Sequence, residues 1–452
     1  MKKFSEMTLE ELLLPEGYPC SCGQRHQAGL RRVRIGPGAV NALPDILREL
    51  GISRPFLLSD RNTRKAAWDY VGPVLEAACI PYFEYVFNQE RLEPDERACG
   101  SLLMAFEPEC DGLLVIGSGV LNDIGKVFSH AANLPMMVVA TAPSMDGYAS
   151  DNASMIRGNV KVSLYNACPQ AVIADTRILC GAPERMLQAG LGDMLAKYLS
   201  ICEWRISHLV TGEYYCENIA GLVRASLQRI IAEAKGLKAR EEKAVGHVME
   251  GLLLSGIAMA YARVSRPASG LEHYFSHIWE MMSLERGTPL ELHGIQVGIG
   301  TLLTLQIWEK LRVMDPNRDK AERFISKFDE DAWKALVLRI FPSTGEGILS
   351  TAIREGRNDP AAHAERLEKI LTHWPQILKI VREELPSHEE IESLMRGLNM
   401  PVTPEEIGFS SQDTHDALLG AREIRNKYLT SSLLWDLGLL YELDFPSATL
   451  KK

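Results

Sequence analysis

The sequence lacks an excess of basic residues. Its 452 residues include 49 Lys and Arg against 59 Asp and Glu, which gives a formal net charge of −10 at pH 7. Proteins that bind nucleic acid use clustered cations to displace phosphate counterions, so this balance argues against a nucleic-acid partner. We expect a small-molecule ligand instead, with a local cationic pocket if that ligand is an anion.

Long apolar runs are also missing, because no stretch approaches the ~18 apolar residues of a membrane-spanning helix. The N-terminal segment MKKFSEMTLEELLLPEG begins with two lysines, but acidic residues interrupt the apolar region that a secretory signal needs. An even set of cysteines is also missing: the nine cysteines are an odd number in a long chain, which favours reduced thiols over a disulfide framework. These absences predict a cytoplasmic globular protein without a membrane span.

The first third of the sequence alternates strand and helix patterns. Strands are expected at 31–36, 55–60, 81–87, 112–119 and 136–141, and helices at 40–51, 63–78, 94–105 and 121–131. The runs 112–119 and 136–141 are apolar without alternation, as in strands that helices cover on both faces. The pattern predicts a Rossmann-like α/β fold with a parallel sheet that binds ligands at the carboxyl ends of its strands.

The strand signal ends near residue 183. Helical patterns follow at 184–207, 213–236, 240–264, 270–284, 294–312, 319–340, 361–384, 388–397 and 411–440. We therefore expect an α/β domain over 1–182 and an all-α domain over 183–452. The segment 313–405 mixes charged helices with loops and is interpreted as a helical insertion in the second domain.

Two polar loops follow consecutive predicted strands. The first runs Gly117-Ser118-Gly119-Val120-Leu121-Asn122-Asp123 and opens a helix, where glycines and the helix N-terminus favour a pyrophosphate. The second offers oxygens for phosphate or ribose from Thr141, Ser144, Asp146 and Ser150. The residues of both loops are also typical of ordinary turns that bind no ligand.

Asp60 ends the predicted strand 55–60. A carboxylate there would accept the ribose hydroxyls of a dinucleotide and disfavour a 2′-phosphate, which favours NAD over NADP. The same residue is equally suited to cap the following helix.

Histidines cluster in the helical half. His273 and His277 are spaced i, i+4, and His293 opens the next helix, whereas the whole chain has 11 His. Asp193 and Lys197 share a helical face upstream. Two imidazoles and a carboxylate leave coordination positions open, which suits a catalytic divalent metal, although isolated histidines on apolar helices are usually core residues.

A third candidate is the run Cys20-Ser-Cys22-Gly-Gln-Arg-His26. It has the ligand types of a zinc site, but no second pair at the usual spacing completes four ligands.

The runs TAPSMDGYAS, GLGDMLAKY, SGLEHYFSH and LHGIQVGIGT, in this order, resemble the sn-glycerol-1-phosphate dehydrogenase family, especially its bacterial AraM-like branch. That family belongs to the glycerol dehydrogenase, iron-containing alcohol dehydrogenase and dehydroquinate synthase group. The resemblance spans about 30–310 and resumes at 406–440. It implies a dehydroquinate synthase-like fold, NADH as cofactor, one Zn, Ni or Fe ion per subunit, and dihydroxyacetone phosphate and sn-glycerol 1-phosphate as the substrate pair.

The resemblance also implies roles for single residues. Gly117 and the run Gly119–Asp123 would bind the NAD pyrophosphate, and Thr141, Ser144 and Ser150 would contact the cofactor. Asp193, His273 and His293 would hold the metal ion, with Asp193, His277 and Asp146 acting in catalysis. Candidate contacts to a substrate phosphate are Arg157, Lys161 and Lys197.

Three alternatives stay open at this point. One is a dehydrogenase for glycerol or another unphosphorylated polyol, and another is a carbon–oxygen lyase of the dehydroquinate synthase type. The third is a binding protein without catalysis on the same fold. For the dehydrogenase, a homodimer is expected, because the long helical domain offers surface.

Overall fold

The computed structural model describes residues 2–158 and 160–443, which form two compact units. Unit 1 comprises the described residues up to Met194 together with Cys216–Pro267. Unit 2 comprises Leu195–Tyr215 and the described residues from Ala268 onward. The sequence analysis predicted a different kind of division, by function, with cofactor binding up to residue 182 and metal binding after it. That division stays a prediction.

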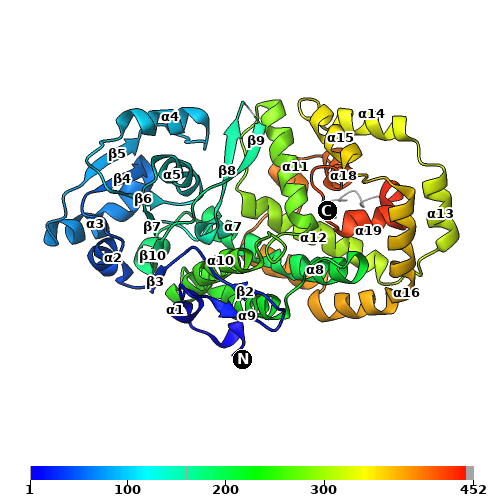
Figure 1. The fold of residues 1–452 in the computed structure, drawn as a ribbon, viewed down its shortest axis with the longest axis horizontal. Coiled ribbons are helices and arrows are strands. Elements are labelled where there is room, and N and C mark those ends of the chain that lie inside the picture. Colours follow the sequence, from blue (N-terminus) through cyan, green and yellow to red (C-terminus); the bar gives the residue numbers. More distant parts are fainter. Residues whose placement is uncertain (1, 159, 444–452) are drawn as a thin grey trace. The chain divides into compact units, whose positions relative to one another are not determined.

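Unit 1 is built on a six-stranded parallel sheet of order β3-β10-β7-β6-β4-β5 (Figure 1). Its strands are β3 (Arg32–Gly36), β4 (Pro55–Asp60), β5 (Phe83–Phe87), β6 (Gly112–Gly117), β7 (Met136–Ala140) and β10 (Ala171–Asp175). Five of them were predicted. The sixth, β10, was missed, although Ala171 pairs with Arg32 on one side and Met137 on the other.

Helices cover both faces of this sheet, as the apolar strands predict. On one face α2 (Leu43–Glu49) and α3 (Arg61–Ala77) share a core with Leu57, Leu114 and Ile173. On the other face α5 (Gly119–Ala132) packs closely, since a Cβ at Gly125 would lie 2.6 Å from Cγ2 of Val115. Two further helices are α4 (Glu96–Ala105) and α6 (Thr176–Leu179). The Rossmann-like architecture is confirmed.

Unit 1 also contains α1 (Leu9–Leu12), two hairpins, three longer helices and several short 3-10 helices. The hairpins are β1 (Tyr18–Pro19) with β2 (Arg25–His26), and β8 (Asn152–Arg157) with β9 (Val160–Tyr165). The helices are α7 (Glu184–Leu195), of which all but the last residue lies in unit 1, α9 (Glu217–Glu233) and α10 (Glu242–Ala262).

Among the described residues, one helix, α10, is long and apolar enough to cross a membrane. Its most apolar window has a mean hydropathy of 1.3, and 72% of that window is buried inside the protein. Burial of this extent is typical of a core helix, and length and composition alone are weak evidence for a span.

Every regular element described in unit 2 is a helix, as expected. The α-helices are α8 (Lys197–Thr211), α11 (Leu271–Arg286), α12 (His293–Leu311), α13 (Arg318–Ser326), α14 (Glu330–Ile340), α15 (Gly345–Arg354), α16 (Pro360–Glu384), α17 (His388–Gly397), α18 (Ser411–Ala421) and α19 (Thr430–Asp436). Helices α11 and α12 approach closely, because a Cβ at Gly300 would lie 2.5 Å from the carbonyl oxygen of Glu272. Whether 313–405, which contains α13 to α17, is an insertion stays a prediction.

Candidate active site

The turn between β6 and α5 has the features of an anion site. Ser118 is the N-cap of α5 but its side chain makes no cap hydrogen bond, and the first turn of the helix holds no acidic residue. The positive end of the helix is therefore not neutralised by its own side chains. Gly117 is required here because a Cβ would lie 2.5 Å from Cδ1 of Leu121. These features fit the pyrophosphate of a dinucleotide.

A buried lysine holds the second loop in place. Lys126 of α5 donates to the carbonyl oxygens of Gly147 at 2.6 Å and Asn152 at 2.8 Å, and to Oγ of Ser150 at 3.3 Å. Burial lowers the pKa of Lys126, against the opposing effect of the nearby Asp123 carboxylate. The loop that carries Thr141, Ser144 and Ser150 is thus anchored to the helix that follows the glycine turn.

The carboxylate of Asp123 has a structural partner. Its Oδ2 accepts the backbone N–H of Ser154 at 3.1 Å, which ties α5 to β8. Burial raises the pKa of Asp123, although Lys126 acts in the opposite direction. The predicted contact of this position with the cofactor stays a prediction.

Two glycines let helices press against the same loop. A Cβ at Gly190 of α7 would lie 1.8 Å from the carbonyl oxygen of Pro143, and one at Gly256 of α10 would lie 2.8 Å from Cβ of Ala149. This packing brings two predicted acidic residues together within unit 1. Oδ2 of Asp193 accepts the backbone N–H of Asp146 at 2.9 Å, and the Asp146 carboxylate accepts the hydroxyl of Ser255 at 2.8 Å.

Other predicted cofactor residues differ in what they contact. Asn122 is buried, and its Oδ1 has no hydrogen-bond partner among the described residues. A buried acceptor of this kind is suited to a donor on a bound ligand. Asp60 caps α3, since its Oδ1 accepts the backbone N–H groups of Asn62 and Thr63, both at 2.8 Å. The capping interpretation of Asp60 is therefore confirmed, and its role toward ribose stays a prediction.

Three imidazoles gather within unit 2. His273 and His277 lie on α11, and α12 begins at His293. The ring centroids of His273 and His293 are 5.2 Å apart, and those of His277 and His293 are 5.7 Å apart. We refer to these three residues as the histidine cluster.

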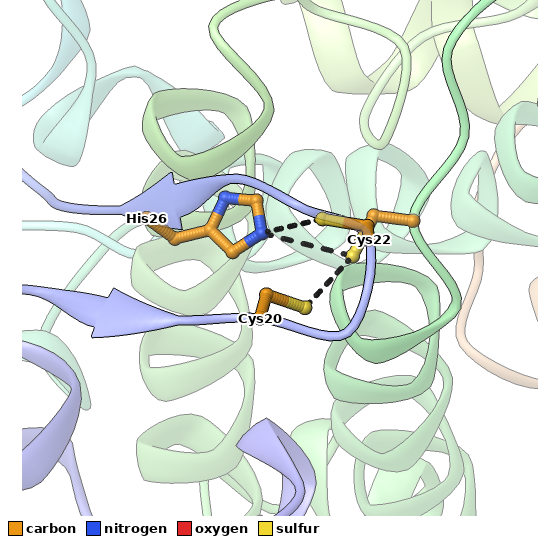
Figure 2. Close-up of side chains that lie close together, drawn as sticks. Cys20, Cys22 and His26 are labelled. Carbon is orange, nitrogen blue, oxygen red and sulfur yellow. Dashed lines mark hydrogen bonds between the residues drawn. The ribbon is translucent and has the colours of Figure 1, made fainter.

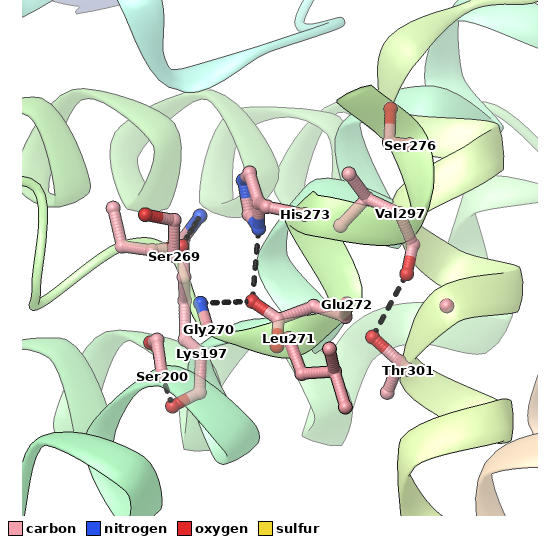
Figure 3. A network of polar contacts seen from close by, with 12 residues as sticks. Lys197, Ser200, Ser269, Gly270, Leu271, Glu272, His273, Ser276, Val297 and Thr301 are labelled. Atoms are coloured by element: carbon pink, nitrogen blue, oxygen red, sulfur yellow. Dashed lines mark hydrogen bonds and ion pairs between the residues drawn. The ribbon is translucent and has the colours of Figure 1, made fainter. Parts of the chain in front are cut away.

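Neighbouring side chains fix the tautomers of two of these rings. Nδ1 of His273 lies 2.9 Å from Oε1 of Glu272, which also accepts the backbone N–H of Gly270 at 2.6 Å (Figure 3). Because a carboxylate can only accept, the proton is on Nδ1 and the lone pair on Nε2. A carboxylate behind an imidazole is the usual second partner of a metal-binding histidine.

The same reasoning applies to His293. The hydroxyl of Ser276 donates to Oε1 of Gln296 at 2.9 Å, and it also lies 2.9 Å from Nδ1 of His293. A hydroxyl has one proton, so it accepts from the ring, and Nε2 of His293 carries the lone pair. Both histidines thus present Nε2 as a candidate metal ligand, and this donor set fits a divalent ion.

His277 is held in a different state. Its Nδ1 lies 3.5 Å from Oε2 of Glu280, whose other oxygen lies 3.4 Å from Nδ1 of His293. Burial lowers the pKa of His277 to about 3, against the opposing effect of the hydrogen bond that the ring donates to Glu280 and with a further lowering by the charge of Arg425. The ring is therefore neutral at neutral pH.

A buried acid that the sequence did not reveal lies behind the histidine cluster. The Glu203 carboxylate accepts the backbone N–H groups of Leu271 and Thr430, both at 2.9 Å. Burial and the charge of Glu272 raise the pKa of Glu203 to about 7. A Cβ at Gly270 would lie 2.4 Å from Oε2 of Glu203, so only glycine fits between these elements.

Two lysines contact the segment that precedes His273. Nζ of Lys197, which is buried, donates to the carbonyl oxygen of Ala268 at 3.1 Å, and Nζ of Lys427 donates to Oγ of Ser269 at 2.7 Å. The other two cations considered for a phosphate lie on the β8–β9 hairpin of unit 1, where Arg157 is exposed and Lys161 half-buried.

Sequence reasoning assigned no role to several of these residues. Glu272 and Ser276 lie inside SGLEHYFSH, and Lys427 lies inside the resembling segment 406–440, so the signal was present. These residues were not assigned a role because a residue that hydrogen-bonds to a metal-binding histidine has no fixed spacing from it in the sequence.

Comparisons with known proteins agree with this geometry. Residues 34–183 match the model of the iron-containing alcohol dehydrogenase family. A glycerol-1-phosphate dehydrogenase from Halalkalibacterium halodurans is 33% identical over 294 residues, or 64% of this chain and 74% of the relative. One from Geobacillus stearothermophilus is 30% identical over 422 residues, or 92% of this chain and 95% of the relative. The chain belongs to the glycerol-1-phosphate dehydrogenase family.

A solved structure supports the fold. The glycerol dehydrogenase of Schizosaccharomyces pombe superposes with a TM-score of 0.60 at 14% identity, covering 91% of this chain and 89% of that one. The predicted resemblance and fold class are confirmed. Family membership makes the protein an NAD(P)-linked oxidoreductase of the metal-dependent alcohol dehydrogenase class, with one divalent metal ion.

Proposed function

We propose that this enzyme interconverts dihydroxyacetone phosphate and sn-glycerol 1-phosphate with NADH. In the reducing direction the substrate carbonyl carbon gains a hydride, its oxygen gains a proton, and NADH becomes NAD+. The observation that carries the proposal is the pair of histidines, His273 and His293, whose Nδ1 partners leave Nε2 of each ring as the basic nitrogen. This arrangement is combined with membership of a family whose named relatives act on glycerol 1-phosphate.

Asp193, His273 and His293 are proposed as the metal ligands. One carboxylate and two neutral imidazoles accept Zn, Ni or Fe, and they leave positions open for substrate oxygens. When bound, the metal supplies Lewis-acid polarisation of the carbonyl, and the reduced nicotinamide supplies the hydride. Glu272 orients His273, and Ser276 orients His293, so both imidazoles keep the tautomer that ligation needs.

The cofactor would bind at the two loops of unit 1. The uncapped start of α5, from Gly117 to Asp123, is suited to the pyrophosphate, and Oδ1 of Asn122 supplies an unpartnered acceptor. Thr141, Ser144 and Ser150 are proposed as further cofactor contacts. Asp60 is proposed to favour NADH over NADPH through a ribose hydroxyl.

Three residues are proposed to act on the substrate. Asp146 is held by the hydroxyl of Ser255 and would contact the substrate from its anchored loop. His277 is neutral at neutral pH and would pass a proton through water or a substrate hydroxyl. Lys197 is proposed to bind the phosphate, and Lys427, which contacts the same segment, joins it in this role.

The deciding experiment is NADH oxidation by metal-reconstituted protein with dihydroxyacetone phosphate and with dihydroxyacetone, each with and without chelator. A large preference for the phosphate that chelation abolishes supports the proposal. Preference for the free ketone moves the assignment to glycerol dehydrogenase. Inactivity with both, despite bound NADH and metal, favours the lyase or a binding protein.

The protein acts on a small molecule. Its cellular location and its oligomeric state are part of the proposal. A cytoplasmic location and a homodimer are proposed, and sedimentation at several protein concentrations tests the dimer directly.

A further inference from the structure

Four side chains of types that can ligate a metal meet in unit 1, three from one hairpin and one from far along the chain. Cys20, Cys22 and His26 come from the β1–β2 hairpin, and Cys216 is the N-cap of α9, 190 residues beyond His26. Their ligand atoms all lie within 4.8 Å of one another. The sequence showed three of these ligands, and the fold supplies the fourth. We refer to the four residues as the cysteine cluster.

We propose that the cysteine cluster binds one zinc ion as a closed Cys3His site with a structural role. This site is additional to the catalytic metal ion of the family and shares no ligand with it.

The distances match a tetrahedral zinc site. Nε2 of His26 lies 3.3 Å from Sγ of Cys22 (Figure 2). Sγ of Cys216 lies 3.8 Å from Nε2 of His26 and 3.7 Å from Sγ of Cys20. Tetrahedral coordination with Zn–S of ~2.3 Å and Zn–N of ~2.0 Å places two sulfurs about 3.7 Å apart and sulfur and nitrogen about 3.5 Å apart. A disulfide would need ~2.05 Å, so the sulfurs are spaced for a shared ion.

His26 is oriented for ligation before any metal binds. Its Nδ1 lies 2.8 Å from the carbonyl oxygen of Tyr261, which can only accept, so Nε2 carries the lone pair and faces the sulfurs. The ring is fully buried, stacked on Tyr261 and in edge contact with Phe4. The imidazole is therefore fixed by packing and by a hydrogen bond.

Neighbouring groups hold two of the sulfurs in place. Nδ2 of Asn218 donates to Sγ of Cys20 at 3.2 Å, and Cys216 is fixed as the N-cap of the 17-residue helix α9. The turn of the hairpin is tight: the backbone N–H of Gly23 donates to the carbonyl oxygen of Cys20 at 3.0 Å, with φ of +86° at Gly23. Because Gly23 adopts this conformation easily, Cys20 and Cys22 can face the same point.

The number of protein ligands indicates a structural role for the proposed zinc ion. Four protein ligands fill a tetrahedral zinc ion and leave no position for substrate, which is the property of a structural site. Cys20, His26 and Cys216 are buried, so water has little access. The ion would join the N-terminal hairpin to α9, and Tyr261, which orients His26, lies on α10.

The test compares metal content and cobalt spectra of full-length protein. In the His293→Ala background, which removes a proposed catalytic ligand, one zinc equivalent is expected to remain, and the further change Cys216→Ser is expected to remove it. Cys99→Ser, a half-buried cysteine outside the cluster, serves as the matched control and should retain the ion. Cobalt in wild-type protein should show intense sulfur-to-cobalt charge-transfer bands, which the proposed catalytic ligands cannot give because they contain no sulfur.

A second measurement covers the case in which Cys216→Ser does not fold. Titration of wild-type protein with a mercurial should release zinc, and thermal unfolding should then occur at a lower temperature. The proposal is overturned by wild-type protein without thiolate-bound zinc or cobalt. A Cys20–Cys216 disulfide found by mass spectrometry of non-reduced protein would also overturn it, in favour of a redox pair.

Discussion

The histidine cluster of unit 2 and the cysteine cluster of unit 1 differ in how their donors are supported. His273 donates from Nδ1 to the carboxylate of Glu272. His293 donates from Nδ1 to the hydroxyl of Ser276, which in turn donates to the amide oxygen of Gln296, so side chains set the tautomer of both rings. Behind His26 lies the backbone carbonyl of Tyr261, and the remaining donors are sulfurs held by a turn, by a helix end and, at Cys20, by a hydrogen bond from the neutral amide of Asn218.

This difference is consistent with a catalytic role for the histidine cluster and a structural role for the cysteine cluster. Charged and polar second partners raise the basicity of a ligand and respond to a reacting substrate, as a catalytic ion requires. In the proposed zinc site the cysteine ligands would themselves supply the negative charge, so charged second partners are not needed there. Substitutions should therefore affect turnover in one cluster and stability in the other.

The largest expected effect is that of His293→Ala. Loss of this proposed ligand would remove Lewis-acid polarisation worth several kcal/mol, so turnover should fall by roughly three orders of magnitude. NADH binding should stay nearly intact, because the proposed cofactor loops lie in unit 1. Turnover, fluorescence titration with NADH and metal analysis measure the three quantities, with His373→Ala on α16 as the control. Full activity of the metal-stripped wild type would refute the role of the metal.

A smaller effect is expected for Glu272→Ala. The change removes the acceptor of the His273 Nδ1 proton without removing a ligand, so metal affinity and turnover should each fall about 10–100-fold. Metal titration of the stripped enzyme measures the affinity, and the exposed Glu389→Ala on α17 is the matched control. Unchanged affinity would show that the carboxylate does not orient the ring.

The smallest effect concerns pH. The pKa of Glu203 is raised from 4.5 to about 7 in the folded protein, so its contribution to stability is present below pH 4.5 and is lost as pH rises through about 7. By linkage the loss is at most about 3 kcal/mol. Between pH 5 and pH 8, wild-type protein should therefore lose more unfolding free energy than Glu203→Gln. Zinc binding to the cysteine cluster has the opposite dependence, because its thiolates are protonated as pH falls. Equal pH dependence of the two proteins would exclude Glu203 as the source.

Sequence reasoning succeeded where a local pattern has one physical cause. The uninterrupted apolar runs ending at Gly117 and Ala140 became buried parallel strands, since only a strand covered on both faces tolerates such runs. The strand β10 was missed, although Ala171–Asp175 has the same short apolar character, because no predicted helix marked it as part of the alternation.

Candidate site residues were harder to predict where they depend on distant partners. Cys20, Cys22 and His26 were found together because they share a turn, but Cys216 has no local feature that marks it as their partner. Likewise, Asp123 was recognised as part of the run after the glycine turn, but its partner Ser154 is brought to it only by tertiary packing. Side chains that act through a residue distant in the sequence form no spacing pattern by which they could be recognised.

The position of the N-terminal segment in unit 1 has a consequence for synthesis of the chain. Strand β3 pairs with β10, and His26 packs against Tyr261, 235 residues later. At about 5–20 residues per second, the ribosome needs roughly 10–50 s to supply those partners. The hairpin is thus made well before the residues against which it packs, and capture of an ion by the hairpin must wait until Cys216 has been translated.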